Sequence, residues 1–217
     1  AHYHNNFISM GSFSKMIGPS LRIGYALSKN ESFLEELNYN SNLKSSGGIC
    51  VFNSIMINSI LVKNNLDSHL CKVINILKKR HDTMIKELDK ANEILVDKGL
   101  FFEYSIPNGG YFVLVKLCDN GFFDECSYKS KIIDYLLDEC KINKVSFLPG
   151  EKFNCSDNDE FLLNFRLSFS YYNEEEISEG INRILLSLLN LEKVRIVTFG
   201  GNSNELLKSK LGKFSCF

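Results

Sequence analysis

The 217-residue sequence lacks an excess of charge of either sign, a long uninterrupted hydrophobic run and any closely spaced pair of cysteines. Its 25 lysine and arginine residues nearly balance 26 aspartate and glutamate residues, so the net charge of −1 gives no basic field for nucleic acid. The longest apolar runs, such as 181–191, are interrupted by polar residues well short of a membrane span, and we expect no transmembrane helix. The seven cysteines include no C-x-x-C pair, which favours a reducing compartment and, by default, the cytoplasm.

Signals for secretion and for metal binding are also missing. Residues 1–6 have neither the basic nor the apolar region of a signal peptide. His2 and His4 form an H-x-H pair, but no third ligand stands at a useful spacing, so we expect no metal site. The basic run 78–81 lies within a helical pattern and is interpreted as a solvated helix face. The remaining composition, 44% hydrophobic and 24% charged, is ordinary for a soluble globular protein with one or two cores.

The most informative segment is 12–24, with the sequence SFSKMIGPSLRIG. A lysine ammonium is not a nucleophile, but Lys15 in a pocket beside hydroxyls and a cation can lose its proton and form a Schiff base with an aldehyde. Pyridoxal phosphate is the common biological aldehyde used in this way. Its phosphate needs hydroxyl and guanidinium donors, for which the candidates are Ser12, Ser14 and Arg22. The alternative is that the lysine and arginine are ordinary solvated loop residues.

The apolar pattern predicts how this segment is framed. We expect strands over 7–10, 22–27, 101–104, 111–115, 145–147 and 161–170. We expect helices over 32–37, 51–62, 65–95, 130–140 and 174–191. Lys15 then lies in a loop between two strands, where Gly18 and Pro19 turn the chain. Asn173 is the expected N-cap of the last helix, and the acidic residues that follow it suit the positive end of the helix dipole.

A second candidate is Arg166, on the strand expected over 161–170. One face of this strand is apolar: Phe161, Leu163, Phe165, Leu167 and Phe169. Arg166 therefore shares the other face with Asn164 and Ser168. A planar guanidinium suits bidentate capture of a carboxylate, in which a charged hydrogen bond contributes roughly 1.5–3 kcal/mol. On this strand alone, an ordinary structural ion pair is an equal alternative.

Four segments, taken in order, resemble one known family. They are SFSKMIGPSLRIGY (12–25), PNGGYF (107–112), LPGEKF (148–153) and NFRLSF (164–169). Together they resemble the fold type I pyridoxal-phosphate-dependent aminotransferases of class I/II. The lysine-to-arginine spacing of seven residues, with Gly-Pro between, is more similar to the aminoadipate/kynurenine-type branch than to aspartate aminotransferase itself. Each segment alone is a weak signal, but coincidence is improbable for four in the correct order.

The resemblance implies an α/β fold, in which the end of a large cofactor-binding domain, a mixed sheet with helices, is followed by a small α+β domain. The expected ranges are 1–75 for the end of the large domain and 76–191 for the small domain with its connecting helix, with 192–217 unassigned. Only fourteen residues precede Lys15, whereas the family's other cofactor contacts come before its lysine segment. We therefore expect a C-terminal portion that begins roughly halfway through an aminotransferase.

The resemblance also implies roles for the candidate residues. Lys15 would hold pyridoxal phosphate as a Schiff base and carry a proton during amino transfer. The phosphate would be anchored by Ser12, Ser14 and Arg22. Arg166 would hold the α-carboxylate of an amino acid or 2-oxoacid substrate. Phe153 is a candidate for the pocket wall. Residues 46–53 are a weak candidate for a segment near the active site of a homodimer. No nucleic-acid or membrane partner is expected. Two alternatives stay open, namely a non-catalytic interaction or regulatory remnant of the fold, and another pyridoxal-phosphate reaction such as elimination or decarboxylation.

Overall fold

The computed structural model describes residues 7–41, 50–120, 131–155 and 159–199, without the side chains of 159 and 192–199. The chain separates into two compact units, and the division falls between Ile74 and Asn75, inside one long helix. None of the helices in the described ranges combines the length and the apolar content needed to cross a membrane.

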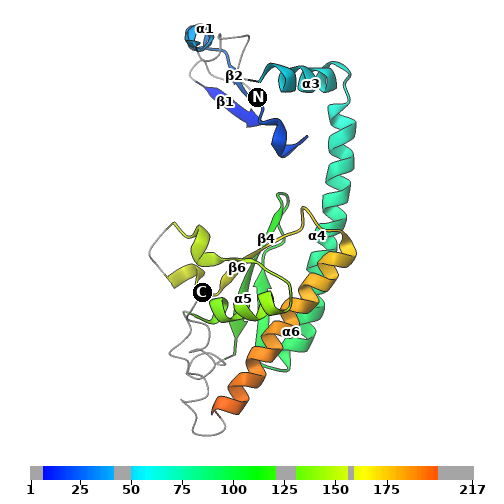
Figure 1. Cartoon of the computed structure of the whole chain (residues 1–217), viewed down its shortest axis with the longest axis vertical. Coiled ribbons are helices and arrows are strands. Elements are labelled where there is room, and N and C mark those ends of the chain that lie inside the picture. Colours follow the sequence, from blue (N-terminus) through cyan, green and yellow to red (C-terminus); the bar gives the residue numbers. More distant parts are fainter. Residues whose placement is uncertain (1–6, 42–49, 121–130, 156–158, 200–217) are drawn as a thin grey trace. The chain divides into compact units, whose positions relative to one another are not determined.

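The first unit contains an antiparallel pair of strands, β1 (Ile8–Ser12) and β2 (Gly24–Ser28), and the helices α1 (Glu31–Tyr39) and α3 (Val51–Val62) (Figure 1). Asn30 caps α1, since its Oδ1 accepts a hydrogen bond of 3.1 Å from the Phe33 amide. The strands and helices expected from the sequence here are confirmed, with ends displaced by at most two residues.

The helix α3 is unusual because its apolar residues are spread around the whole helix and do not gather on one side. Of its twelve residues only Ile57 is buried, whereas Phe52, Ile55 and Val62 are 75%, 62% and 71% exposed in the described structure. The two strands beside it are also largely exposed on both faces. A helix that is hydrophobic all round is normally buried, and a two-stranded sheet is marginal by itself in water.

The second unit starts with the rest of α4 (Leu66–Val96), the helix expected over 65–95. The residues that it buries are Met84, Leu88, Ala91 and Leu95, which are three or four positions apart and therefore form one stripe. The chain then forms the strands β3 (Leu100–Tyr104) and β4 (Phe112–Asp119), the helix α5 (Ile132–Ile142) and the short strand β5 (Leu148–Pro149). The 3₁₀ turns η4 (Gly150–Phe153) and η5 (Asp159–Phe161), the strand β6 (Asn164–Ser168) and the helix α6 (Glu174–Phe199) follow.

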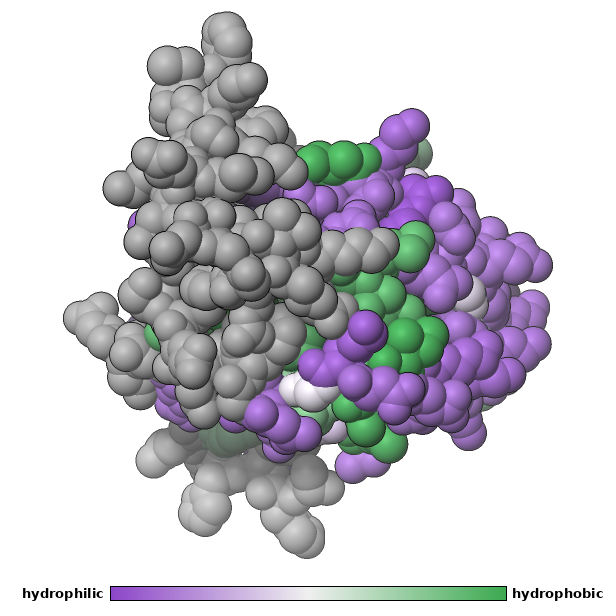
Figure 2. Space-filling model, turned by 90° about the horizontal axis from the view of Figure 1, so that it is seen from below, coloured by the Kyte–Doolittle hydropathy of each residue, from purple (hydrophilic) through white to green (hydrophobic). Residues whose placement is uncertain are grey.

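These strands form one antiparallel sheet in the order β3-β4-β6-β5 (Figure 1). One face is the core face: Val113, Val115, Leu117, Phe165 and Leu167 are at most 5% exposed and share a cluster with apolar residues of α4, α5 and α6. The opposite face carries Phe112, Leu114, Arg166 and Ser168, which are partly or largely exposed. Among the residues that Figure 2 colours, most are hydrophilic, with hydrophobic residues gathered mainly near the middle of the view.

Two local contacts fix the edges of this unit. Asn92 of α4 pairs with the backbone of Phe102 on the outer strand β3: its Nδ2 donates to the Phe102 carbonyl at 2.9 Å, and its Oδ1 accepts from the Phe102 amide at 2.6 Å. At the start of α6, Asn173 Oδ1 accepts from the Glu176 amide at 2.9 Å, and Glu176 Oε2 accepts from the Asn173 amide at 3.0 Å. The predicted N-cap is therefore confirmed as a reciprocal capping box.

Some expected elements differ from the structure. The strand expected over 145–147 lies at β5 instead, the strand expected over 161–170 is shortened to β6 by the η5 turn, and α6 continues to Phe199 beyond its expected end at Leu191. The helix expected over 130–140 is confirmed two residues further on, as α5. The hairpin pairing of the strands expected over 101–104 and 111–115 is confirmed by the ladder between Leu100–Tyr104 and Val115–Asp119.

Candidate active site

The lysine segment forms a closed loop between β1 and β2. The strand ladder ends at the pair Ser12 and Gly24, so residues 13–23 leave the sheet. At the base of the loop, the Phe13 amide donates to the Ile23 carbonyl at 3.0 Å. The Phe13 carbonyl accepts hydrogen bonds from three amides, those of Met16, Ile17 and Gly18, at 3.2, 2.8 and 3.3 Å. The backbone around Lys15 is therefore held by three hydrogen bonds to a single carbonyl oxygen.

An aromatic pair anchors this loop. The Phe13 side chain is only 8% exposed, and its ring centroid lies 5.3 Å from that of Tyr25 on β2. The Tyr25 ring passes over Gly11, its partner in the strand register, so closely that a Cβ at Gly11 would overlap the ring. A side chain at position 11 would therefore force the Tyr25 ring to move.

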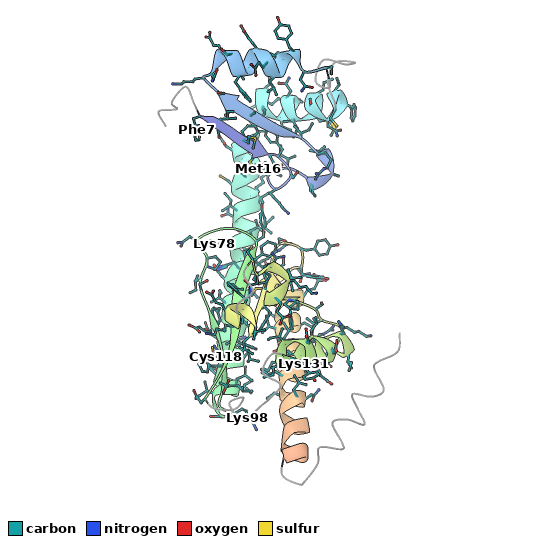
Figure 3. All side chains as sticks on the ribbon, turned by 90° about the vertical axis from the view of Figure 1, so that its left-hand side faces the viewer. Phe7, Met16, Lys78, Lys98, Cys118 and Lys131 are labelled. Atoms are coloured by element: carbon teal, nitrogen blue, oxygen red, sulfur yellow. The ribbon has the colours of Figure 1, made fainter. Side chains whose placement is uncertain are left out.

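Two helices of the same unit also hold the loop. Asn53 of α3 donates from Nδ2 to the Leu21 carbonyl at 2.9 Å, and His69 Nε2, on α4, lies 2.9 Å from the Met16 carbonyl oxygen. Figure 3 marks Phe7 where β1 begins and Met16 in the loop that follows it. Sequence reasoning missed His69. It included Asn53 only within the weak candidate 46–53, of which 46–49 lie outside the described residues.

The side chains predicted to bind the cofactor lie on this loop and on Ser12, the last residue of β1 before it. Ser12, Lys15 and Arg22 are exposed and Ser14 is half-buried, and the Ser12 Oγ accepts a hydrogen bond of 3.1 Å from the Ser14 amide. Arg22 has φ 52° and ψ 40°, the left-handed conformation, directly after the 3₁₀ turn η1 (Pro19–Leu21). The turn expected at Gly18 and Pro19 is present, since Gly18 precedes η1 and Pro19 begins it, and it continues to Arg22; Gly18 itself has φ −176°, which any residue can adopt.

This donor set fits pyridoxal phosphate by its chemistry. An amine is required for an aldehyde, while two hydroxyls and a permanently charged guanidinium suit a phosphate. The loop offers all three kinds of group within eleven residues, on a backbone fixed by the hydrogen bonds above. In the described part of the chain, no three His, Cys, Asp or Glu side chains gather where they could hold a metal ion, and His2 and His4 lie outside that part.

Arg166 belongs to the second unit, on β6. Its partners in register are Leu114 on β4 and Leu148 on β5. The Arg166 guanidinium carbon lies 4.0 Å from the centroid of the Phe112 ring and 5.7 Å from that of the Phe153 ring. An open pocket of about 240 Å³ adjoins it, lined by Phe112, Ser146, Phe147, Leu148, Arg166 and Ser168.

Arg166 makes no ion pair in the described structure. Its contacts there are with the two phenylalanine rings, and no carboxylate within the described ranges lies within 4.0 Å of the guanidinium. The structural ion pair that the sequence left open thus finds no partner among these residues. The Arg166 guanidinium instead borders a pocket that is lined by serine and aromatic side chains.

Two neighbours of Arg166 are buried for reasons that the alternating pattern did not predict. Asn164 shares its face of the strand, as expected, but is only 8% exposed, and its Oδ1 has no hydrogen-bond partner among the described residues. Gly150 is also buried, and a Cβ there would overlap the Phe161 carbonyl oxygen and lie 2.8 Å from that of Asn164. The P-G segment is therefore needed to let two stretches of backbone approach each other.

With this geometry established, comparison with known proteins defines the class. No protein-family model matches the chain. An aromatic-amino-acid aminotransferase of Thermococcus litoralis is 29% identical over 179 residues, which are 82% of this chain and 38% of that protein. The crystal structure of α-aminoadipate aminotransferase LysN from Thermus thermophilus, complexed with N-(5'-phosphopyridoxyl)-L-leucine, superposes with a TM-score of 0.64 at 24% identity and covers 86% of this chain and 43% of that one.

The fold is that of a pyridoxal-phosphate-dependent aminotransferase of fold type I. This chain corresponds to its C-terminal portion, with aromatic and aminoadipate aminotransferases among its homologues and structural neighbours. The helix-turn-helix-type transcriptional regulator NorG of Staphylococcus aureus is also 26% identical over 82% of this chain and 35% of its own length. The chain thus spans about two fifths of the length of the curated relatives it matches.

Proposed function

We propose that the intact protein is an aminotransferase that moves an amino group between an amino acid and a 2-oxoacid, with pyridoxal phosphate on Lys15. The single observation that carries this proposal beyond the fold is Arg166, a half-buried arginine that faces an open pocket without a carboxylate partner in the described structure. An unpaired guanidinium in a partly apolar pocket is suited to the carboxylate that every amino acid and 2-oxoacid carries.

Each residue of the site has a defined task in this proposal. When bound, the cofactor supplies an electron sink for the substrate's α-carbon. Lys15 would hold the cofactor through its amine and, as a free amine, would move a proton at that α-carbon. The phosphate is bound by Ser12, Ser14 and Arg22. Arg166 binds the substrate carboxylate and thereby fixes the orientation in which the α-carbon reacts.

We also propose that residues 1–75 are the end of the large domain and 76–191 the small domain with its connecting helix, in a protein that works as a homodimer in the cytoplasm. The exposed apolar surface of α3 and of the β1–β2 pair supports this assignment, because such surfaces are buried in complete folds. The remaining cofactor contacts of an aminotransferase would then come from the parts of the fold that this chain does not include.

The test is to trap the cofactor on the intact protein. Borohydride reduction after incubation with pyridoxal phosphate should fix the cofactor on Lys15, identified by peptide mass, and should leave none on that peptide in Lys15→Ala. Lys29→Ala is the matched control, because Lys29 is an exposed lysine of the same unit next to β2. Visible absorbance of the bound cofactor that persists unchanged in Lys15→Ala would refute the assignment.

A second candidate function is regulatory, and the similarity to the transcriptional regulator NorG favours it. A regulator that retains this fold is expected to give no product with any pair of amino acid and 2-oxoacid. Product analysis with a panel of such pairs therefore separates the two candidates. The same analysis detects elimination or decarboxylation, which would release ammonia or carbon dioxide in place of a new amino acid.

A further inference from the structure

On the open face of the second unit's sheet, the Phe112 ring lies next to Arg166, the arginine proposed to bind the substrate carboxylate. Phe112 on β4 pairs in register with Ser168, and Leu114 pairs with Arg166, so Phe112 and Arg166 are diagonal neighbours on the same face. Diagonal side chains on adjacent strands stand roughly 7–8 Å apart at Cβ, a distance that long and aromatic side chains can bridge. The guanidinium carbon of Arg166 lies 4.0 Å from the Phe112 ring centroid.

This contact constrains the guanidinium in a useful way. A cation 4.0 Å from a ring centroid is within range of attraction by the ring quadrupole. A guanidinium that stacks on an aromatic face keeps its N–H donors in its own plane, directed outward from the edge of the group. These donors are the ones that form a bidentate pair with a carboxylate. A ring contact through the face of the Arg166 guanidinium would leave its hydrogen-bonding edge to a ligand.

The exposure and the surroundings of Phe112 also suit a residue that orients the Arg166 guanidinium. Phe112 is 41% exposed, so its ring is not part of the apolar core, and both residues line the same open pocket. The Phe153 ring is more distant from the guanidinium, at 5.7 Å. No other group within the described ranges holds the charged end of Arg166 by an ion pair or a hydrogen bond.

We infer that Phe112 is a positioning residue, whose ring face holds the Arg166 guanidinium in the orientation that binds the carboxylate of an amino acid or 2-oxoacid. The inference rests on the carboxylate-binding role proposed for Arg166 and adds to it the residue that fixes the arginine. Phe112 itself is not assigned any contact with the reacting atoms.

The test uses the binding of 3-phenylpropionate to the intact protein, measured by calorimetry. This probe has a carboxylate and an apolar body that suits a pocket lined by Phe147 and Leu148, and it has no amino or keto group that could react with a cofactor. Phe112→Leu, which keeps most of the apolar volume without the ring, should raise the dissociation constant about threefold to tenfold. Phe112→Tyr, which keeps the ring, should stay within about twofold of the wild type.

Three further variants make the measurement specific. Arg166→Gln should abolish binding of the probe. Phe153→Leu should weaken binding less than Phe112→Leu, because its ring is farther from the cation. Tyr172→Leu, which removes an exposed aromatic ring elsewhere in this unit, should leave binding unchanged.

A structural readout accompanies the binding. Protons near the Arg166 guanidinium should resonate upfield in NMR spectra, because they lie over the Phe112 ring, and this shift should disappear in Phe112→Leu and persist in Phe112→Tyr. The inference is overturned if Phe112→Leu binds 3-phenylpropionate as tightly as the wild type, if Phe112→Tyr is weakened equally, or if the wild type binds the probe only independently of Arg166. None of these measurements requires turnover, so a failure of the proposed enzymatic function is recognised separately, by the absence of cofactor on Lys15 and of amino transfer.

Discussion

Replacing Gly150 by alanine tests whether close backbone packing determines the position of the strand that carries Arg166. The added Cβ would overlap the Phe161 carbonyl oxygen, and it would lie 2.8 Å from the Asn164 carbonyl oxygen and 3.0 Å from the Asn164 Cβ. Two of these three atoms belong to the backbone and cannot rotate away. Asn164 pairs in register with Lys116 on β4, so a shift of Asn164 also strains the strand ladder.

The expected magnitude follows from two opposing terms. Overpacking of a buried site costs about 1–3 kcal/mol and more where backbone atoms must move. Alanine also reduces the conformational freedom of the unfolded chain, which returns about 0.4–1 kcal/mol. We therefore expect Gly150→Ala to lower the free energy of unfolding by about 2 kcal/mol, as measured by urea denaturation of the intact protein.

Gly180 provides a matched control, because the same chemical change should have the opposite sign there. It lies inside α6, and no heavy atom of another part of the described structure lies within 4 Å of the place where its Cβ would be. Alanine is favoured over glycine in a helix interior by about 0.5–1 kcal/mol, so Gly180→Ala should stabilise the protein by that amount. A Gly150→Ala variant at least as stable as the wild type would refute the argument from close packing, whatever the result at Gly180.

Two further predictions concern the core of the second unit. Asn92→Ala leaves both backbone polar groups of the buried Phe102 without their side-chain partner. We expect this variant to lower the free energy of unfolding by about 2–3 kcal/mol and to speed hydrogen exchange at the Phe102 amide. An unchanged exchange rate would contradict the prediction. Burial raises the pKa of the Cys140 thiol to about 11, so its folded-state pKa lies above the unfolded one. The contribution of the neutral thiol to the free energy of unfolding is present at lower pH and is lost as pH rises from about 9 through 11. Unfolding titrations across this range should show a smaller loss of stability in Cys140→Ala than in the wild type.

The helices show where sequence periodicity is sufficient. The expected helix over 65–95 corresponds to α4, because a long apolar repeat at intervals of three and four residues leaves few alternatives, and the apolar run over 51–62 corresponds to α3. The strand expected over 145–147 begins three residues before the observed strand β5. Phe147 is buried against Phe165, with ring centroids 4.6 Å apart, yet the ladder pairs residues of β5. Burial and strand pairing are separate properties, and an apolar pattern reports only burial.

The basic run 78–81 was predicted as a solvated face, and this is wrong for two of its members. Arg80 donates from one Nη to the Ser170 carbonyl at 2.8 Å, and the His81 side chain is 15% exposed and lies edge-on to the Phe169 ring at 5.5 Å. His81 stands three positions before Met84, on the stripe that α4 buries. Helical phase could have identified His81 as partly buried, whereas charge alone suggested the opposite.

The lysine loop and the surroundings of Arg166 differ in how well the sequence predicts them. The lysine loop is recognised from the order of its residues, because its chemistry depends on which groups stand close together along the chain. The surroundings of Arg166 depend on register instead. Only the pairing of Phe112 with Ser168 makes Phe112 the diagonal neighbour of Arg166, and a slip of one residue would turn Phe112 toward the core. A motif can therefore name the arginine proposed to bind a carboxylate, but the residue proposed to orient it is defined by the strand ladder. Substitutions at Phe112 thus test the geometry around Arg166 separately from its composition.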